Sequence, residues 1–248
     1  GQKTRQELLE KVAELRRRFP DLPPAAGARP SERSTAAPPA VASERRRDAT
    51  LGLPLDQLAE RLVPPAGGRR ADDRRGAEVL RRLLAPECPE PDAPDDAWWP
   101  TQTEVAKALH FTTVQVHQVL AKARERWRGL GGLTAIRDEL ARLLAAQGGI
   151  AGFREALSLV VDQFGQGLGE PRATDTARQV LRAAIEAEVS VDPSRFELVR
   201  RQGRLWFAVT SGADDRTVEP ATLVRYAQEL GTCAARLAAG DPLPSAAR

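Results

Sequence analysis

The chain has 248 residues, a formal net charge of only +3, 4% aromatic residues and no methionine. Its two cysteines, Cys88 and Cys233, lie far apart, which argues against a disulfide framework and a paired-cysteine zinc site. No apolar run approaches membrane-spanning length and no signal-peptide pattern opens the chain, so we expect no membrane partner. Because the cysteines suggest no disulfide framework, we expect the protein to work in the reducing cytoplasm. Because Gly stands first and methionine is absent, we expect a piece of a longer protein.

Composition and hydrophobic periodicity divide the chain into seven segments. The fold class predicted from them is mainly α, with helical bundle units in which a helix-turn-helix precedes a winged helix carrying a small β-hairpin. In order, the segments are an N-terminal helix (1–20), a disordered Pro/Ala-rich linker (21–50), a helical pair (51–84), an acidic Pro-rich spacer (85–97), the helix-turn-helix (98–130), a winged-helix-like domain (133–210) and a C-terminal helix with a tail (211–248).

The stretch 98–127 predicts two helices joined by a tight turn. Thr101 and Thr112 can each cap a helix, and each has a capping-box partner three residues on, Glu104 and Gln115. His110 stands where such turns normally carry Gly, which requires a left-handed backbone conformation that His adopts at some cost. In the second helix, apolar residues recur at 3.6-residue spacing, from Val116 to Trp127. This pattern resembles the helix-turn-helix of sigma-factor region 4 and of many bacterial repressors, and the alternative is an ordinary helical hairpin.

Residues 133–210 predict the order helix, short strand, helix, helix and hairpin. The short strand is expected at Ile150, and the hairpin turns at Gly203. This order resembles winged-helix domains of bacterial defence and transcription proteins, including the type first seen on RNA polymerase delta subunits. That resemblance implies a recognition helix at 174–189 and a wing bearing Arg200, Arg201 and Arg204, although the acidic end of that helix argues against deep groove entry. Use of the same unit for protein contact is an equal alternative.

A final amphipathic helix is expected over residues 220–239, with Cys233 in its apolar stripe and therefore in the core. The chain has only two histidines, His110 and His117, and neither has a Cys or acidic partner at ligand spacing. We find no candidate catalytic, cofactor-binding or metal-binding residue, so we predict that this chain is not an enzyme.

The order of segments resembles the C-terminal region of the PglW-type serine/threonine kinases of bacterial phage-defence (BREX/Pgl) systems. The stretches behind this resemblance are LPLDQLAERLVP, GRRADDRRGAEVLRRLLA, WPTQTEVAKAL, VHQVLAKARERW, LTAIRDEL and DPLPSAAR, which together span nearly all of residues 50–248. The resemblance implies a multidomain defence protein whose kinase domain lies outside this chain, since no kinase glycine loop or catalytic loop is present in the sequence.

We therefore expect a non-catalytic accessory region that binds duplex DNA through the helix-turn-helix. Gln side chains suit adenine edges and Lys or Arg side chains suit phosphates, and about four phosphate contacts predict a log–log salt slope of roughly −3 to −4. One alternative is a regulatory module that docks the parent kinase domain or another defence-system protein, and a second is a stand-alone transcription regulator. The predicted groove contacts are Thr113, Gln115, His117 and Gln118, and the predicted phosphate contacts are Lys122, Arg124 and Arg126, with Arg200, Arg201 and Arg204 on the wing.

Overall fold

The computed structural model describes residues 13–14, 17, 54–64, 71–86, 93–210 and 219–240. The predicted linker 21–50, most of the predicted N-terminal helix and the tail after residue 240 lie outside these residues. The described elements, in chain order, are α3 (Leu55–Leu62), α4 (Ala71–Leu84), η1 (Asp95–Trp98), α5 (Gln102–Ala108), α6 (Thr113–Arg128), α7 (Gly131–Ala146), β1 (Ile150–Gly152), α8 (Phe153–Phe164), α9 (Arg172–Val189), β2 (Phe196–Arg201), β3 (Arg204–Val209) and α10 (Pro220–Gly240).

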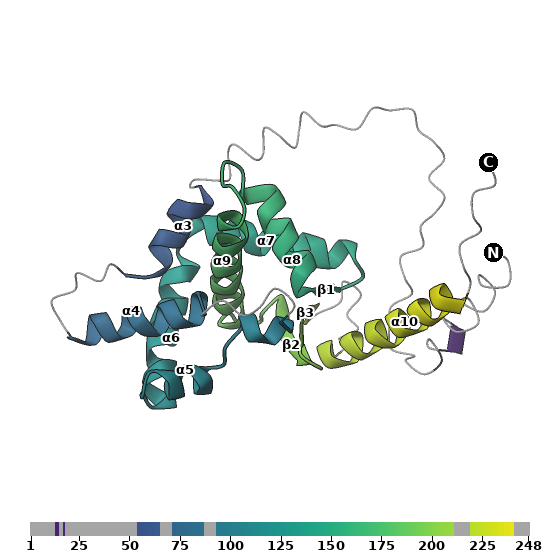
Figure 1. Cartoon of the computed structure of the whole chain (residues 1–248), viewed down its shortest axis with the longest axis horizontal. Coiled ribbons are helices and arrows are strands. Elements are labelled where there is room, and N and C mark those ends of the chain that lie inside the picture. The colour runs from purple at the N-terminus through teal and green to yellow at the C-terminus, as the bar shows by residue number, and fades with distance from the viewer. Residues whose placement is uncertain are drawn as a thin grey trace.

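Helix α9 is the centre of the fold (Figure 1). Helices α3, α4, α6, α7 and α8 and strand β2 all pack against it. Alanines such as Ala177, Ala184 and Ala187 are fully buried on it, so neighbouring helices can approach closely. The predicted recognition helix is α9, and its burial contradicts that role. Along this helix only Arg172, Asp175 and Val189 are exposed, which leaves little free face to place in a DNA groove.

The three strands form one antiparallel sheet in the order β1-β3-β2. Ala151 on β1 pairs with Phe207 on β3, and Leu198 on β2 pairs with the same residue from the other side. The hairpin turns at Gln202 and Gly203, whose φ angles of 52° and 73° are those of a tight two-residue turn. The predicted order of helices, short strand and hairpin is thus confirmed.

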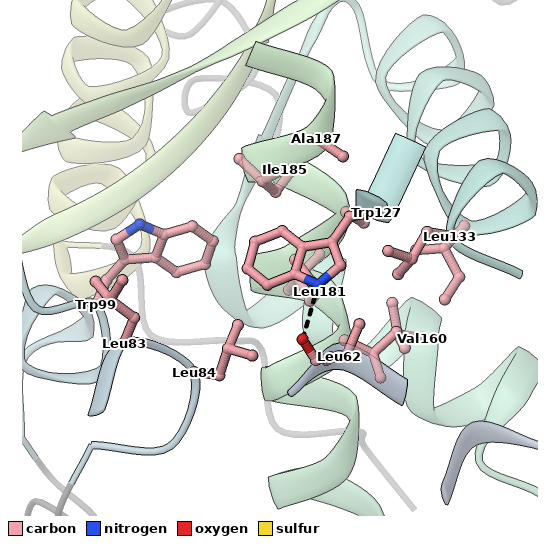
Figure 2. Close-up of a cluster of buried hydrophobic side chains, with 14 of the residues drawn as sticks. Leu62, Leu83, Leu84, Trp99, Trp127, Leu133, Val160, Leu181, Ile185 and Ala187 are labelled. Carbon is pink, nitrogen blue, oxygen red and sulfur yellow. Dashed lines mark hydrogen bonds between the residues drawn. The ribbon is translucent and has the colours of Figure 1, made fainter. Parts of the chain in front are cut away.

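One continuous hydrophobic cluster contains buried residues from three of the predicted segments, 51–84, 98–130 and 133–210. The Trp127 ring, fully buried, donates a hydrogen bond of 3.0 Å from Nε1 to the carbonyl oxygen of Leu62, which ties α6 to the end of α3 (Figure 2). The three segments therefore share a core rather than each having its own. The labelled members of this cluster in Figure 2 are Leu62, Leu83, Leu84, Trp99, Trp127, Leu133, Val160, Leu181, Ile185 and Ala187.

The end of the predicted acidic spacer is anchored to the sheet. Residues 95–98 form a 3₁₀ turn, and the Asp96 N–H donates to the Gly203 carbonyl at 3.3 Å. Trp99, 2% exposed, packs edge-on against Phe153 at 6.1 Å and tilted against Phe207 at 6.3 Å. A buried indole therefore fixes this segment, where composition alone predicted an extended spacer.

Charged groups at the end of α9 are also part of the interior. Glu188 is 2% exposed and accepts hydrogen bonds from the Arg195 guanidinium, the shortest being 2.8 Å, and from Arg137 at 3.4 Å. Desolvation opposes ionisation of Glu188, but the hydrogen bonds from Arg195 outweigh it and hold the pKa of Glu188 below its ordinary value. The acidic end of α9 is thus neutralised inside the protein.

Helix α10 packs on the sheet through its first turns, where Leu223 and Val224 are buried. The rest of the helix extends to one side of the fold (Figure 1). Ala227, Leu230 and Cys233 are only partly buried. The expectation that Cys233 belongs to the core is therefore wrong, because the helix runs past the edge of the sheet that would cover it.

Candidate nucleic-acid interface

Two reciprocal caps define the helices α5 and α6. The Thr101 hydroxyl accepts the Glu104 N–H at 3.2 Å, while the Glu104 carboxylate accepts the Thr101 N–H at 2.6 Å. Thr112 and Gln115 repeat the arrangement at the start of α6, with distances of 3.2 Å and 2.9 Å. Both predicted capping boxes are confirmed. Each gives a hydrogen-bond acceptor to two backbone N–H groups that would otherwise lack partners at the start of the helix.

The turn between the two helices is closed by backbone hydrogen bonds. The Phe111 N–H donates to Ala106 O at 2.9 Å and the His110 N–H donates to Lys107 O at 3.3 Å, which is the Schellman pattern of helix ends. His110 has a φ of 54°, the left-handed value expected from its position. Helix α6 is therefore oriented relative to α5 by local bonds that the sequence signals directly.

The first three turns of α6 present an exposed polar surface, which we call the outer face of α6. Its four members are exposed, whereas Val116, Leu120 and Ala123 form the buried stripe of the helix. Among the residues that the structure describes, none of the four makes a hydrogen bond or ion pair through its side chain. The outer face consists of Thr113, His117, Gln118 and Lys122.

Gln115, the remaining predicted groove contact, is exposed, but half of its side-chain amide is already hydrogen-bonded within the helix cap. Its side-chain oxygen accepts the Thr112 N–H and hydroxyl, so the amide oxygen is occupied. Its amide NH₂ group is left to donate. Gln115 therefore orients a donor outward beside the outer face.

Two of the three predicted phosphate contacts on α6 are used within the fold. The Arg124 guanidinium binds Glu186 on α9 through two bonds, of 2.6 Å and 3.1 Å, and its side chain is 19% exposed. The Arg126 guanidinium donates to the carbonyl oxygen of Leu62, and burial lowers the pKa of Arg126. Of the three, Lys122 alone makes no side-chain hydrogen bond or ion pair within the described residues, and the phosphate roles of the other two stay predictions.

Arg182 on α9 lies beneath the start of α5 and is 3% exposed. It donates to Pro100 O at 2.7 Å, lies 3.8 Å from Glu186 and sits over the Trp99 ring, 4.9 Å from the centroid. Burial lowers the pKa of Arg182 to about 10, so it remains a cation at neutral pH. Cationic side chains on α9 thus support the segment that leads into α5.

The predicted wing is a hairpin whose turn is contacted on one side. Arg200 is exposed, but its guanidinium donates to Trp99 O at 2.7 Å. A Cβ at Gly203 would come within 3.2 Å of Pro94, so the residues before η1 lie directly against the turn. Arg201 and Arg204 pair across the two strands and make no side-chain bond within the described ranges. The structure thus places Arg200 apart from the other two predicted wing contacts.

A groove of about 320 Å³ lies beside the outer face, between α4 and α6. Arg75 and Phe111 line it and were not predicted as site residues from the sequence. Arg75 belongs to a charged stretch in which Asp72 and Asp73 lie between two pairs of arginines, a pattern equally typical of a solvated surface. The full lining is Arg75, Gly76, Val79, Phe111, Gln115, Gln118, Val119 and Lys122.

No group of three or more His, Cys, Asp or Glu side chains that could hold a metal ion occurs in the described part of the chain. Among the same residues, no helix combines the length and apolarity needed to cross a bilayer.

Comparison with known proteins gives one informative relative. No family model and no solved structure matches the chain. In an alignment of 204 residues that covers 78% of the chain, the chain is 33% identical to the probable kinase PglW of Streptomyces coelicolor. The chain spans 13% of the length of that protein. It is therefore related to a region of PglW that makes up a small part of the whole kinase.

Proposed function

We propose that this chain is the non-catalytic accessory region of a PglW-type defence kinase, and that it binds duplex DNA through the outer face of α6. The observation that carries the proposal is that the side chains of this face are exposed and have no partner among the described residues. Thr113, His117, Gln118 and Lys122 are exposed on three successive turns, and none is engaged with another described residue. Two capping boxes hold the helix that presents them.

The chemistry of these side chains suits a major groove. Gln118 and the free amide NH₂ of Gln115 can reach base edges, where a Gln amide matches adenine. Lys122, about one turn beyond Gln118, suits a phosphate beside the groove. An α-helix with this exposed end is the element that the major groove admits.

The link to a kinase comes from the relative, whose name describes a probable kinase. Because no kinase glycine loop or catalytic loop occurs in this sequence, phosphoryl transfer belongs to another part of the parent protein. The DNA-binding region would then bring that kinase to DNA during defence.

A labelled duplex of about 30 base pairs, titrated with the chain at several salt concentrations, tests the proposal by fluorescence anisotropy. Because the guanidinium groups of Arg124 and Arg126 already bond Glu186 and the Leu62 carbonyl, we expect a log–log slope of roughly −1 to −2, shallower than the sequence predicted. The variant His117→Ala/Gln118→Ala/Lys122→Ala should lose at least tenfold in affinity, roughly the value of one good contact. A wild-type chain that binds no duplex at low salt would refute the proposal.

The second candidate is docking of a protein partner, and α10 favours it. Ala227, Leu230 and Cys233 leave a partly exposed apolar stripe beyond the edge of the sheet, a feature that suits a protein contact. Co-purification with the separately expressed kinase domain of the same protein tests this function. Loss of the complex in Leu230→Glu, with DNA binding unchanged, would support it, and no complex with the wild type would refute it.

A further inference from the structure

The groove between α4 and α6 is continuous with the outer face of α6. Gln118 and Lys122 belong to both surfaces, whereas Arg75 and Gly76 form the opposite wall on α4. A Cβ placed on Gly76 would lie 3.9 Å from the Val119 methyl groups, an ordinary contact distance, so α4 and α6 run close together at this point. A ligand on the outer face therefore has α4 within reach.

Every polar side chain that lines the groove is able to donate a hydrogen bond, and none is a carboxylate. Arg75 and Lys122 carry full positive charges and make no hydrogen bond or ion pair within the described residues. Gln115 has its oxygen occupied by Thr112, so its NH₂ group remains. A ligand that satisfies this lining must accept hydrogen bonds and carry negative charge.

The remaining lining is apolar and strengthens that preference. Val79 is 1% exposed, and Phe111 and Val119 are partly buried beside it. Low-dielectric walls next to two cations reduce the screening of their field by water. Elsewhere on α6 the chain supplies its own carboxylate, as Glu186 does for Arg124, but no described carboxylate pairs with Arg75 or Lys122.

We propose that this groove holds a backbone phosphate of duplex DNA, with Arg75 of α4 on one side and Lys122 of α6 on the other. This inference rests on the proposed DNA-binding function and adds a second contacting helix to it. Phosphate contacts fix the register and orientation of a protein on the duplex. Helix α4 thus sets how the outer face of α6 enters the major groove.

The test measures the same labelled duplex, by anisotropy across about 50 to 200 mM salt, with Arg75→Gln. We expect affinity to fall roughly 3- to 10-fold and the absolute salt slope to fall by about one. Arg75→Lys keeps the charge and should recover most of the affinity. The matched control is Arg172→Gln, which removes the same charge from an exposed residue at the start of α9 that does not line the groove.

The possible outcomes separate this inference from the function on which it rests. If the wild type binds and the outer-face triple variant does not, but Arg75→Gln behaves like Arg172→Gln, the inference is wrong and the function stands. If the wild type binds no duplex, the function itself fails. If a labelled peptide of eight glutamates binds more tightly than duplex at equal salt, and Arg75→Gln abolishes its binding, the groove takes an acidic protein segment instead. Circular dichroism confirms that each variant is folded.

Discussion

The two sides of helix α6 carry similar side chains and use them differently. On the side toward α9 and α3, Arg124 binds Glu186, and Trp127 donates to Leu62. On the outer side, His117, Gln118 and Lys122 have no such partners within the described chain. The comparison shows that a positive charge on a helix indicates DNA binding only where the fold does not already neutralise it.

The same distinction extends beyond α6. Arg182, Arg195 and Arg200 are all fixed by carboxylates or by backbone carbonyls near the core. The lining of the groove between α4 and α6 instead contains two cations, Arg75 and Lys122, that the described chain does not pair. An arginine-rich composition therefore says little about nucleic-acid binding until each guanidinium is placed.

The largest effect is expected from Trp127→Ala, on the inner side. The ring is fully buried, and its removal leaves a cavity between α6 and α3 and takes one of two hydrogen bonds from the Leu62 carbonyl, which keeps the bond from Arg126. We expect a loss of about 3–5 kcal/mol in the free energy of unfolding, measured by urea titration with circular dichroism. Val114→Ala, at a position that is 63% exposed, is the control and should change stability by less than about 0.5 kcal/mol. Equal effects of the two substitutions would contradict the assignment of the inner side to the core.

A direct contrast comes from Arg124→Gln and Lys122→Gln, two residues apart on one helix. Arg124→Gln removes two hydrogen bonds to Glu186 in a partly buried site and leaves Glu186 with Arg182, 3.8 Å away, so it should cost about 1–3 kcal/mol of stability. Lys122→Gln should change stability by less than about 0.5 kcal/mol while weakening DNA binding.

The capping boxes provide a smaller, pH-dependent effect. The hydrogen bond from the Thr101 N–H, followed by that from its hydroxyl, lowers the pKa of Glu104 below its ordinary value. Since the folded pKa is below the unfolded one, this stabilisation is complete above the ordinary carboxyl range and is lost as the pH falls through the folded pKa. Glu104→Gln should cost roughly 0.5–1 kcal/mol near neutral pH, and its difference from the wild type should shrink below about pH 4.

The second box supplies the control for that pH dependence. Gln115 occupies the position equivalent to Glu104 but does not titrate. Gln115→Ala should therefore destabilise by a similar amount, about 0.5–1 kcal/mol, with the same value at both pH extremes. A difference between wild type and Glu104→Gln that stays constant with pH would show that the carboxylate charge contributes nothing to the cap.

Features that depend on neighbours in sequence were predictable. Both caps, the left-handed His110 and the Gly203 hairpin follow from side chains within a few residues of the bonds they make. The short strand at Ile150 was predicted too, because Gly residues end the preceding helix. In each case one local interaction decides the conformation.

Features that depend on distant partners were not predictable. Arg124 and Glu186 are 62 residues apart, and nothing in either segment signals the pair. The alanines of α9 suit close packing on any side, so periodicity did not reveal that the helix is enclosed on most of its circumference. The groove lining comes from α4, the turn and α6, and Arg75 looked like any other arginine in a balanced charged stretch.

The smallest expected effect concerns the turn that joins α5 and α6. His110 has a φ of 54°, a conformation that costs a side chain with a Cβ more than it costs Gly. His110→Gly removes that strain but gives the unfolded chain more freedom, so the net gain should be about 0.5 kcal/mol. Gln202, with a φ of 52° in the hairpin turn, offers a matched second site, and Gln202→Gly should show a similar gain.

Thermal unfolding of His110→Gly, Gln202→Gly and His110→Ala, measured together, shows whether backbone strain causes the expected gain in stability. His110→Ala keeps the Cβ in the left-handed conformation, so it should gain nothing if strain at that position is the reason. Because His110 lies outside the outer face, His110→Gly should also leave DNA affinity and salt slope unchanged. A loss of DNA binding in His110→Gly, with stability intact, would instead place the turn itself among the contacts and extend the binding surface from α6 onto the end of α5.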